Sequence, residues 1–103
     1  MRIKMRLQKK GLEMFFRDYQ ITILQKLWEN PGLNSRSVWN NVEGISRAGV
    51  IVFLNAMVDA GLLSYVERSA KGGYQRVYSS KFDEKGTKEY LKTLVLEKLK
   101  TLK

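Results

Sequence analysis

The chain has 103 residues, which is the length of one domain and leaves no room for a second hydrophobic core. It carries 19 basic and 10 acidic residues, and its formal net charge of +9 attracts polyanions, of which nucleic acid is the leading candidate. Cysteine and histidine are both absent, which excludes disulfides, thiolate nucleophiles and the commonest zinc ligands. We therefore expect no cofactor, no metal site and no enzymatic activity.

The longest apolar run, over residues 49–54, is far shorter than the ~20 residues that cross a bilayer, and the N-terminus lacks the apolar core of a signal peptide. These features predict a cytoplasmic protein with no membrane partner. A basic composition also occurs in proteins whose charge serves only solubility. The inference of nucleic-acid binding from charge therefore needs a fold that supports it.

Residues 1–17 contain six basic side chains and one acidic one, so over half of the net charge lies in this segment. The basic residues are Arg2, Lys4, Arg6, Lys9, Lys10 and Arg17. The apolar residues Leu7, Leu12, Phe15 and Phe16 are too many for a free tail. The segment is therefore predicted to be a basic arm whose later part packs on the body of the protein. Whether the arm contacts DNA is left open.

The first helix is expected from Asp18 onward. Apolar residues recur there at three- and four-residue steps as far as Trp28, and Asn-Pro-Gly at 30–32 then ends the pattern with a turn signal. A short second helix is expected over 36–42, capped by the hydroxyl of Ser35.

A third helix is predicted to follow a tight turn at Gly44. Ser46 is its expected N-cap, the helical pattern runs to Ala60, and Gly61 suits the left-handed residue that commonly ends a helix. One side of this helix is an apolar stripe that predicts the core, consisting of Val50, Phe53, Leu54 and Met57. The opposite side is the one that a helix-turn-helix presents to a DNA groove, and it carries Arg47, Ala48, Ile51, Val52, Asn55 and Asp59.

Base readout in the major groove relies on paired donors and acceptors, such as Arg to guanine and Asn to adenine. On the predicted groove side, Arg47 and Asn55 can form such pairs. Ile51 and Val52 could contact thymine methyl groups, which favours A·T-rich sites or recognition of DNA shape. The alternative is that Ile51 and Val52 are buried against another element of the protein.

A β-hairpin is predicted after the third helix. Residues 62–68 and 74–80 are rich in β-branched and aromatic side chains, and the glycine-containing link 69–73 is a hairpin signal. Cations on such a wing can displace counterions from DNA phosphates. The predicted wing contacts are Arg68, Lys71, Gly72, Gly73 and Arg76. The alternative is a solvated hairpin with ordinary surface charges.

Residues 82–103 are predicted to form a terminal helix with Asp83 as its cap. Apolar residues at three- and four-residue steps form a stripe on this helix, namely Leu91, Leu94, Val95, Leu99 and Leu102. A lone helix of this length is marginal in water, so the stripe is expected to bury against a second copy of the chain. The sequence thus predicts a homodimer.

The order of these elements, mainly α with a small β-hairpin, is that of a winged helix-turn-helix with an added C-terminal dimerisation helix. The chain also resembles the penicillinase-repressor (BlaI/MecI-like) family of winged helix-turn-helix transcriptional regulators, in LQKLW at 24–28, SRAGVIVFLNAMVDAGLL at 46–63 and RVYSS at 76–80. The resemblance implies a homodimer held by C-terminal helices, a helix in the major groove and a wing on phosphates. The groove-facing positions that it implies are Ser46, Arg47, Ala48, Ile51, Val52 and Asn55. Family members usually carry basic or hydroxyl side chains on the groove side, where this chain has Ala48, Ile51 and Val52.

We therefore divide the chain into a basic arm (1–17), a winged-helix DNA-binding domain (18–80) and a helix for dimerisation (81–103). The predicted function is that of a homodimeric transcriptional regulator, a repressor that binds double-stranded DNA and blocks polymerase. Two alternatives remain open. One is a winged-helix module that binds another protein through Ile51 and Val52, and the other is a sequence-neutral nucleic-acid-binding protein.

Overall fold

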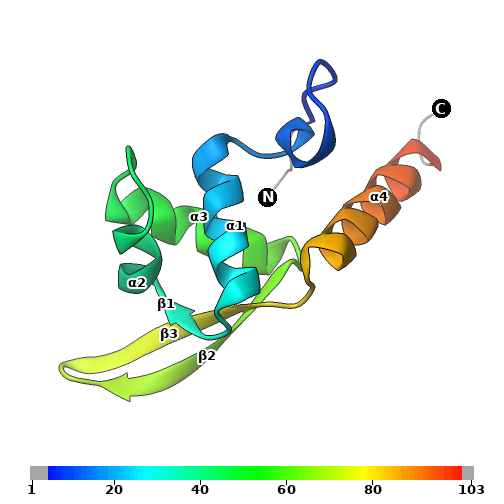
Figure 1. Ribbon diagram of the computed structural model, residues 1–103. Coiled ribbons are helices and arrows are strands. Elements are labelled where there is room, and N and C mark those ends of the chain that lie inside the picture. Colours follow the sequence, from blue (N-terminus) through cyan, green and yellow to red (C-terminus); the bar gives the residue numbers. More distant parts are fainter. Residues whose placement is uncertain (1–4, 101–103) are drawn as a thin grey trace.

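Three helices and a small antiparallel sheet make up the body of the protein, in a computed structural model that describes residues 5–100 (Figure 1). The elements in chain order are the 3-10 helix η1 (Gly11–Met14), α1 (Asp18–Glu29), β1 (Leu33–Asn34), α2 (Ser35–Asn40), α3 (Arg47–Asp59), β2 (Leu63–Ala70), β3 (Gly73–Ser80) and α4 (Glu84–Lys100). The hairpin β2–β3 extends past the three helices at one end of the molecule, and α4 projects at the other (Figure 1). The expected mainly helical fold with a small hairpin is confirmed.

Local capping sets where the helices begin. The hydroxyl of Ser46 accepts a hydrogen bond from the backbone N–H of Gly49 at 3.1 Å and caps α3, as predicted. The second helix was predicted one residue too late at its start and two residues too long at its end. Its cap is Asn34, whose side-chain oxygen accepts from the N–H of Ser37 at 2.8 Å, because strand pairing holds Asn34 in an extended conformation.

The sheet contains a strand that the sequence analysis missed. β1 pairs with β3, with Leu33 opposite Tyr78, so the strand order is β1-β3-β2. A strand of two residues is too short to show an alternating pattern. The hairpin is also tighter than predicted, because strand pairing continues to Ala70 opposite Gly73. The connection is therefore a two-residue turn, and Gly72 there has a φ of +89°, which suits glycine.

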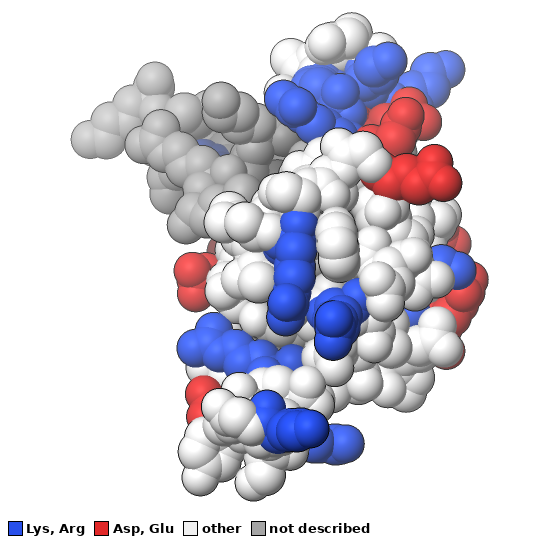
Figure 2. All heavy atoms as spheres, turned by 90° about the vertical axis from the view of Figure 1, so that its left-hand side faces the viewer, with Lys and Arg blue, Asp and Glu red and all other residues white. Residues whose placement is uncertain are grey.

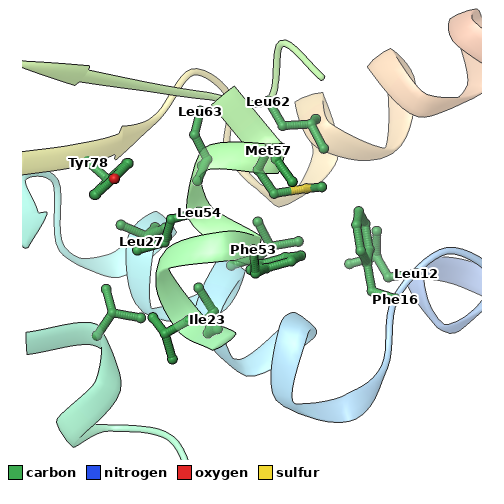
Figure 3. Close-up of a cluster of buried hydrophobic side chains, with 14 of the residues drawn as sticks. Leu12, Phe16, Ile23, Leu27, Phe53, Leu54, Met57, Leu62, Leu63 and Tyr78 are labelled. Atoms are coloured by element: carbon green, nitrogen blue, oxygen red, sulfur yellow. The ribbon is translucent and has the colours of Figure 1, made fainter. Parts of the chain in front are cut away.

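The core lies between α1, α3 and the inner side of the hairpin (Figure 3). The predicted stripe of α3 is confirmed, since Val50, Phe53, Leu54 and Met57 are all at most 3% exposed. Phe16, from the N-terminal segment, meets Phe53 edge to face with ring centroids 6.2 Å apart. The later part of the arm thus packs on the body, as expected.

The earlier part of the described arm folds back on itself. The guanidinium of Arg6 donates to the carbonyl oxygens of Glu13 and Phe16, each at 2.6 Å. Arg6 therefore serves the internal structure of the arm. Arg2 and Lys4, which were assigned to the same basic arm, lie outside the described residues.

α4 begins as predicted, with the Asp83 carboxylate accepting from the N–H of Gly86 at 2.7 Å. One member of its predicted dimer stripe needs correction. Leu91 is only 2% exposed because it joins the core of its own chain, so it offers no surface to a partner. Leu94 and Val95 are half-buried, Leu99 is 55% exposed, and Leu102 lies outside the described residues. Within the described range, no helix has the length and apolar character that spanning a membrane requires.

Candidate nucleic-acid interface

The outer side of α3 faces solvent. Arg47 and Ala48 are exposed in its first turn, and Val52 one turn later is 69% exposed. Ile51 is half-buried at the edge of this face. The alternative that both Ile51 and Val52 are buried inside the protein is therefore wrong for Val52. Ser46 is exposed as well, but its hydroxyl is engaged in capping the helix.

A cleft of about 680 Å³ separates α2 and α3 from the hairpin. Four cationic side chains line it, and none of its described lining residues is acidic. They come from three different parts of the fold and are Arg36, Arg47, Lys71 and Arg76. Amides and hydroxyls supply the rest of the polar lining, namely Asn34, Ser35, Asn55, Gln75, Tyr74 and Tyr78. Such a lining suits a polyanion, because it supplies positive charge and donors without a repelling carboxylate.

The charge distribution over this side of the molecule agrees with the lining of the cleft. Figure 2 views the side where α2 and the hairpin tip lie in Figure 1. Basic side chains lie in the middle and lower parts of this face and in a further group at its top, and acidic ones lie beside that upper group and along the two sides (Figure 2). Positive potential is therefore present where α3 and the wing are exposed, in addition to the basic charge of the N-terminal arm.

The predicted wing residues divide into two groups. Lys71, Gly72, Gly73 and Arg76 line the cleft, whereas Arg68 is exposed but does not line it. Side chains alternate along a strand, so Arg68 lies on the opposite face of the hairpin from its neighbour Glu67, which faces Arg76. Alternation alone does not exclude Arg68 from the cleft, because its cross-strand partner Gln75 lines it. Arg68 lies on β2, which is at the far edge of the sheet from β1 and which contributes Ala70 to the lining.

Arg76 lies in the middle of the hairpin, opposite Glu67. Its Nη1 donates to the side-chain oxygen of Asn55 at 3.1 Å. Its guanidinium carbon lies 4.2 Å from the ring centroid of Tyr65, and its Nε is 4.0 Å from a carboxylate oxygen of Glu67. Arg76 is thus held on three sides by the protein.

Asn55, predicted to read a base, lines the cleft but is engaged by the protein. Its Oδ1 accepts a hydrogen bond from the hydroxyl of Tyr78 at 2.6 Å, in addition to the bond from Arg76. Tyr78 is 2% exposed, whereas Tyr74 near the hairpin tip is 78% exposed. The hairpin tyrosines therefore have different surroundings, with Tyr78 packed into the core and Tyr74 open to solvent.

Arg36 and the α2 end of the cleft were missed by the sequence analysis. Arg36 is exposed in the first turn of α2 and lines the cleft. Nearby, the Asn34 amide donates to the side-chain oxygen of Gln75 on β3 at 3.0 Å. In a helix-turn-helix the first helix crosses the DNA backbone. A cation at the start of that helix, here Arg36, was therefore the sequence signal that could have predicted a phosphate contact.

The fold is found in a solved structure of a possible HxlR family transcriptional factor from Thermoplasma volcanium GSS1. The two chains are 17% identical and superpose with a TM-score of 0.56, over 90% of this chain and 82% of that chain. No family model matches the chain, and no curated protein matches it. The likeness establishes the winged helix-turn-helix fold and gives no support for the penicillinase-repressor family in particular.

Proposed function

We propose that the protein binds duplex DNA and regulates transcription, with the outer side of α3 in the major groove. The observation that carries this proposal is the cleft, in which four cations from α2, α3 and the hairpin converge beside an exposed helix face. An α-helix fits the major groove of B-DNA, and a hairpin beside it meets the adjoining backbone. The transcription-factor designation of the structural neighbour agrees with this function.

The cleft residues fall into two roles under this proposal. Arg47 is exposed at the N-terminal end of α3, where recognition helices contact base edges, and its guanidinium can pair with guanine O6 and N7. Val52 does not line the cleft, but its exposed side chain on α3 can contact a thymine methyl group. Arg36, Lys71 and Arg76 bind phosphates from both walls of the cleft. Each phosphate contact contributes about 0.9 to the salt slope, so three predict a slope of roughly −3 per protomer.

We further propose that the protein acts as a homodimer and represses by occupying a promoter. The apolar side chains of α4 that are not buried in the chain support dimerisation, and they include Leu96 and Leu99, at 49% and 55% exposed. An apolar groove of about 300 Å³ between α4 and the N-terminal segment lies next to them. Two-fold symmetry then predicts half-sites about one helical turn, roughly 34–36 Å, apart. The resemblance to penicillinase repressors favours steric blocking of polymerase.

Selection of bound duplexes from a random pool, followed by titration at several salt concentrations, tests the proposal. We expect an enriched palindromic site and binding that weakens steeply as salt rises. Equal affinity for all duplexes would favour the sequence-neutral nucleic-acid-binding protein. No binding even at low salt would favour the protein-interaction module, since Val52 would then be exposed for a protein partner.

A further inference from the structure

Three side chains join α3 to the wing, and we refer to Asn55, Arg76 and Tyr78 as the wing brace. Asn55 lies on α3, and the other two lie on β3, two residues apart and therefore on one face of the strand. The oxygen of the Asn55 amide accepts from Arg76 Nη1 at 3.1 Å and from Tyr78 Oη at 2.6 Å. The recognition helix and the wing are thereby connected through a single acceptor atom.

That atom has no remaining capacity for a base. An amide oxygen offers two lone pairs, and both are occupied in the brace. Pairing with adenine requires the same oxygen to accept from N6 while the amide nitrogen donates to N7. Asn55 would have to release one of its two donors, either Arg76 or Tyr78, and the buried hydroxyl of Tyr78 would lose its acceptor in the second case.

Arg76, in contrast, keeps a surface for an anion. Its side chain is 43% exposed and lines the cleft, although Asn55, Tyr65 and Glu67 contact it. A guanidinium has five N–H donors, and the contacts with Asn55 and Glu67 use the Nη1 and Nε sides. The brace therefore fixes the direction of a cation that still has donors to offer.

We propose that Asn55 is a positioning residue, which aims Arg76 at a DNA phosphate and sets the wing against α3, and that it reads no base. This inference rests on the proposed function. It removes one of the two predicted base readers, so hydrogen-bonded base recognition by α3 rests on Arg47. The preset wing reduces the ordering that binding would otherwise require.

The test compares Asn55→Ala, Arg76→Ala, the double variant and Arg47→Ala on the selected duplex and its single-base variants. We expect Asn55→Ala and Arg76→Ala each to weaken binding to every duplex by roughly 3- to 10-fold and to lower the salt slope by about 0.9, with base preference unchanged. The double variant should bind no worse than Arg76→Ala, because both act through one contact. The proposal would be overturned if Asn55→Ala relaxed the preference at one base pair and left the salt slope unchanged. Arg47→Ala is the control that shows how large a loss of base preference the assay detects.

Tyr78→Phe provides a second test, in which the two roles of Asn55 predict opposite changes in DNA binding. It also serves if Asn55→Ala fails to fold. The substitution removes the hydroxyl of a residue that is 2% exposed and frees one lone pair of Asn55. A positioning role predicts weaker binding to all duplexes, since the brace is loosened. A base-reading Asn55 would instead gain preference for adenine, and that result would contradict the inference. If the unaltered protein bound no DNA, the proposed function itself would fail.

Discussion

Under the proposed function, Arg47 is the residue through which α3 would supply hydrogen-bonded base specificity. It is exposed in the first turn of α3 and lines the cleft. We expect Arg47→Ala to relax preference at one base pair, at a cost of about 1–3 kcal/mol for the selected site and little for random duplexes. Competition binding on single-base variants measures this, with Arg47→Lys as the variant that keeps charge and loses the bidentate fork. Equal losses on all duplexes would assign Arg47 to a phosphate.

Gly61 illustrates how two constraints can meet at one residue. Its φ is +86°, and a Cβ there would collide with the hydroxyl of Tyr90, which donates to the Ala60 carbonyl at 3.0 Å. Gly44 has a φ of +78°, and a Cβ there would meet no atom within 4 Å, so this glycine carries the backbone constraint alone.

We therefore expect Gly44→Ala to lower the free energy of unfolding by about 1–2 kcal/mol, and Gly61→Ala to lower it by about 1–3 kcal/mol more because of the steric overlap. Urea denaturation of both variants measures the difference. Equal destabilisation would show that Tyr90 moves aside without cost.

The wing illustrates how position along the hairpin selects among neighbouring cations. Lys71 lies in the turn and lines the cleft, whereas Arg68, three residues earlier on β2, does not line it. We expect Lys71→Ala to weaken binding to all duplexes and to reduce the salt slope by about 0.9, whereas Arg68→Ala should change the slope much less. Binding isotherms at several salt concentrations compare the two. A larger effect at Arg68 would place the DNA on the opposite side of the hairpin.

α2 and the sheet show what sequence patterns omit at the scale of elements. Helical periodicity located α1 and α3 closely, and the hairpin signal located β2 and β3. β1 was missed, and the bounds of α2, the element directly after it, were predicted too late in the sequence. Both depend on β3, because pairing with Val77 and Tyr78 places Asn34 where it can cap α2.

The two ends of the molecule carry different chemistry. The cleft and the hairpin lie at one end, and α4 with the N-terminal segment lies at the other (Figure 1). The arm packs beside α4, lining an apolar groove with it, and none of its described residues lines the cleft. The concentration of charge in the arm is therefore separate from the four cations that line the cleft.

The proposed dimer makes a prediction at this scale. Replacing Leu96 and Leu99 with lysine should give folded monomers, because these exposed side chains have no role in the core of their own chain. Light scattering gives the mass, and thermal melting confirms that the fold remains. Leu91→Lys is the matched comparison, and it should unfold the protein because Leu91 is buried. A folded dimer carrying both exposed substitutions would place the interface away from this part of α4.

The sequence by itself determined the winged helix-turn-helix order, the caps at Ser46 and Asp83 and the core stripe of α3, since periodicity and capping act within a few residues. Only the tertiary structure decided which polar side chains are available to a ligand. Asn55 meets Arg76 21 residues away, and Asn34 meets Gln75 41 residues away. Such pairs depend on how elements pack, and local pattern carries no information about a partner that the chain reaches only by folding.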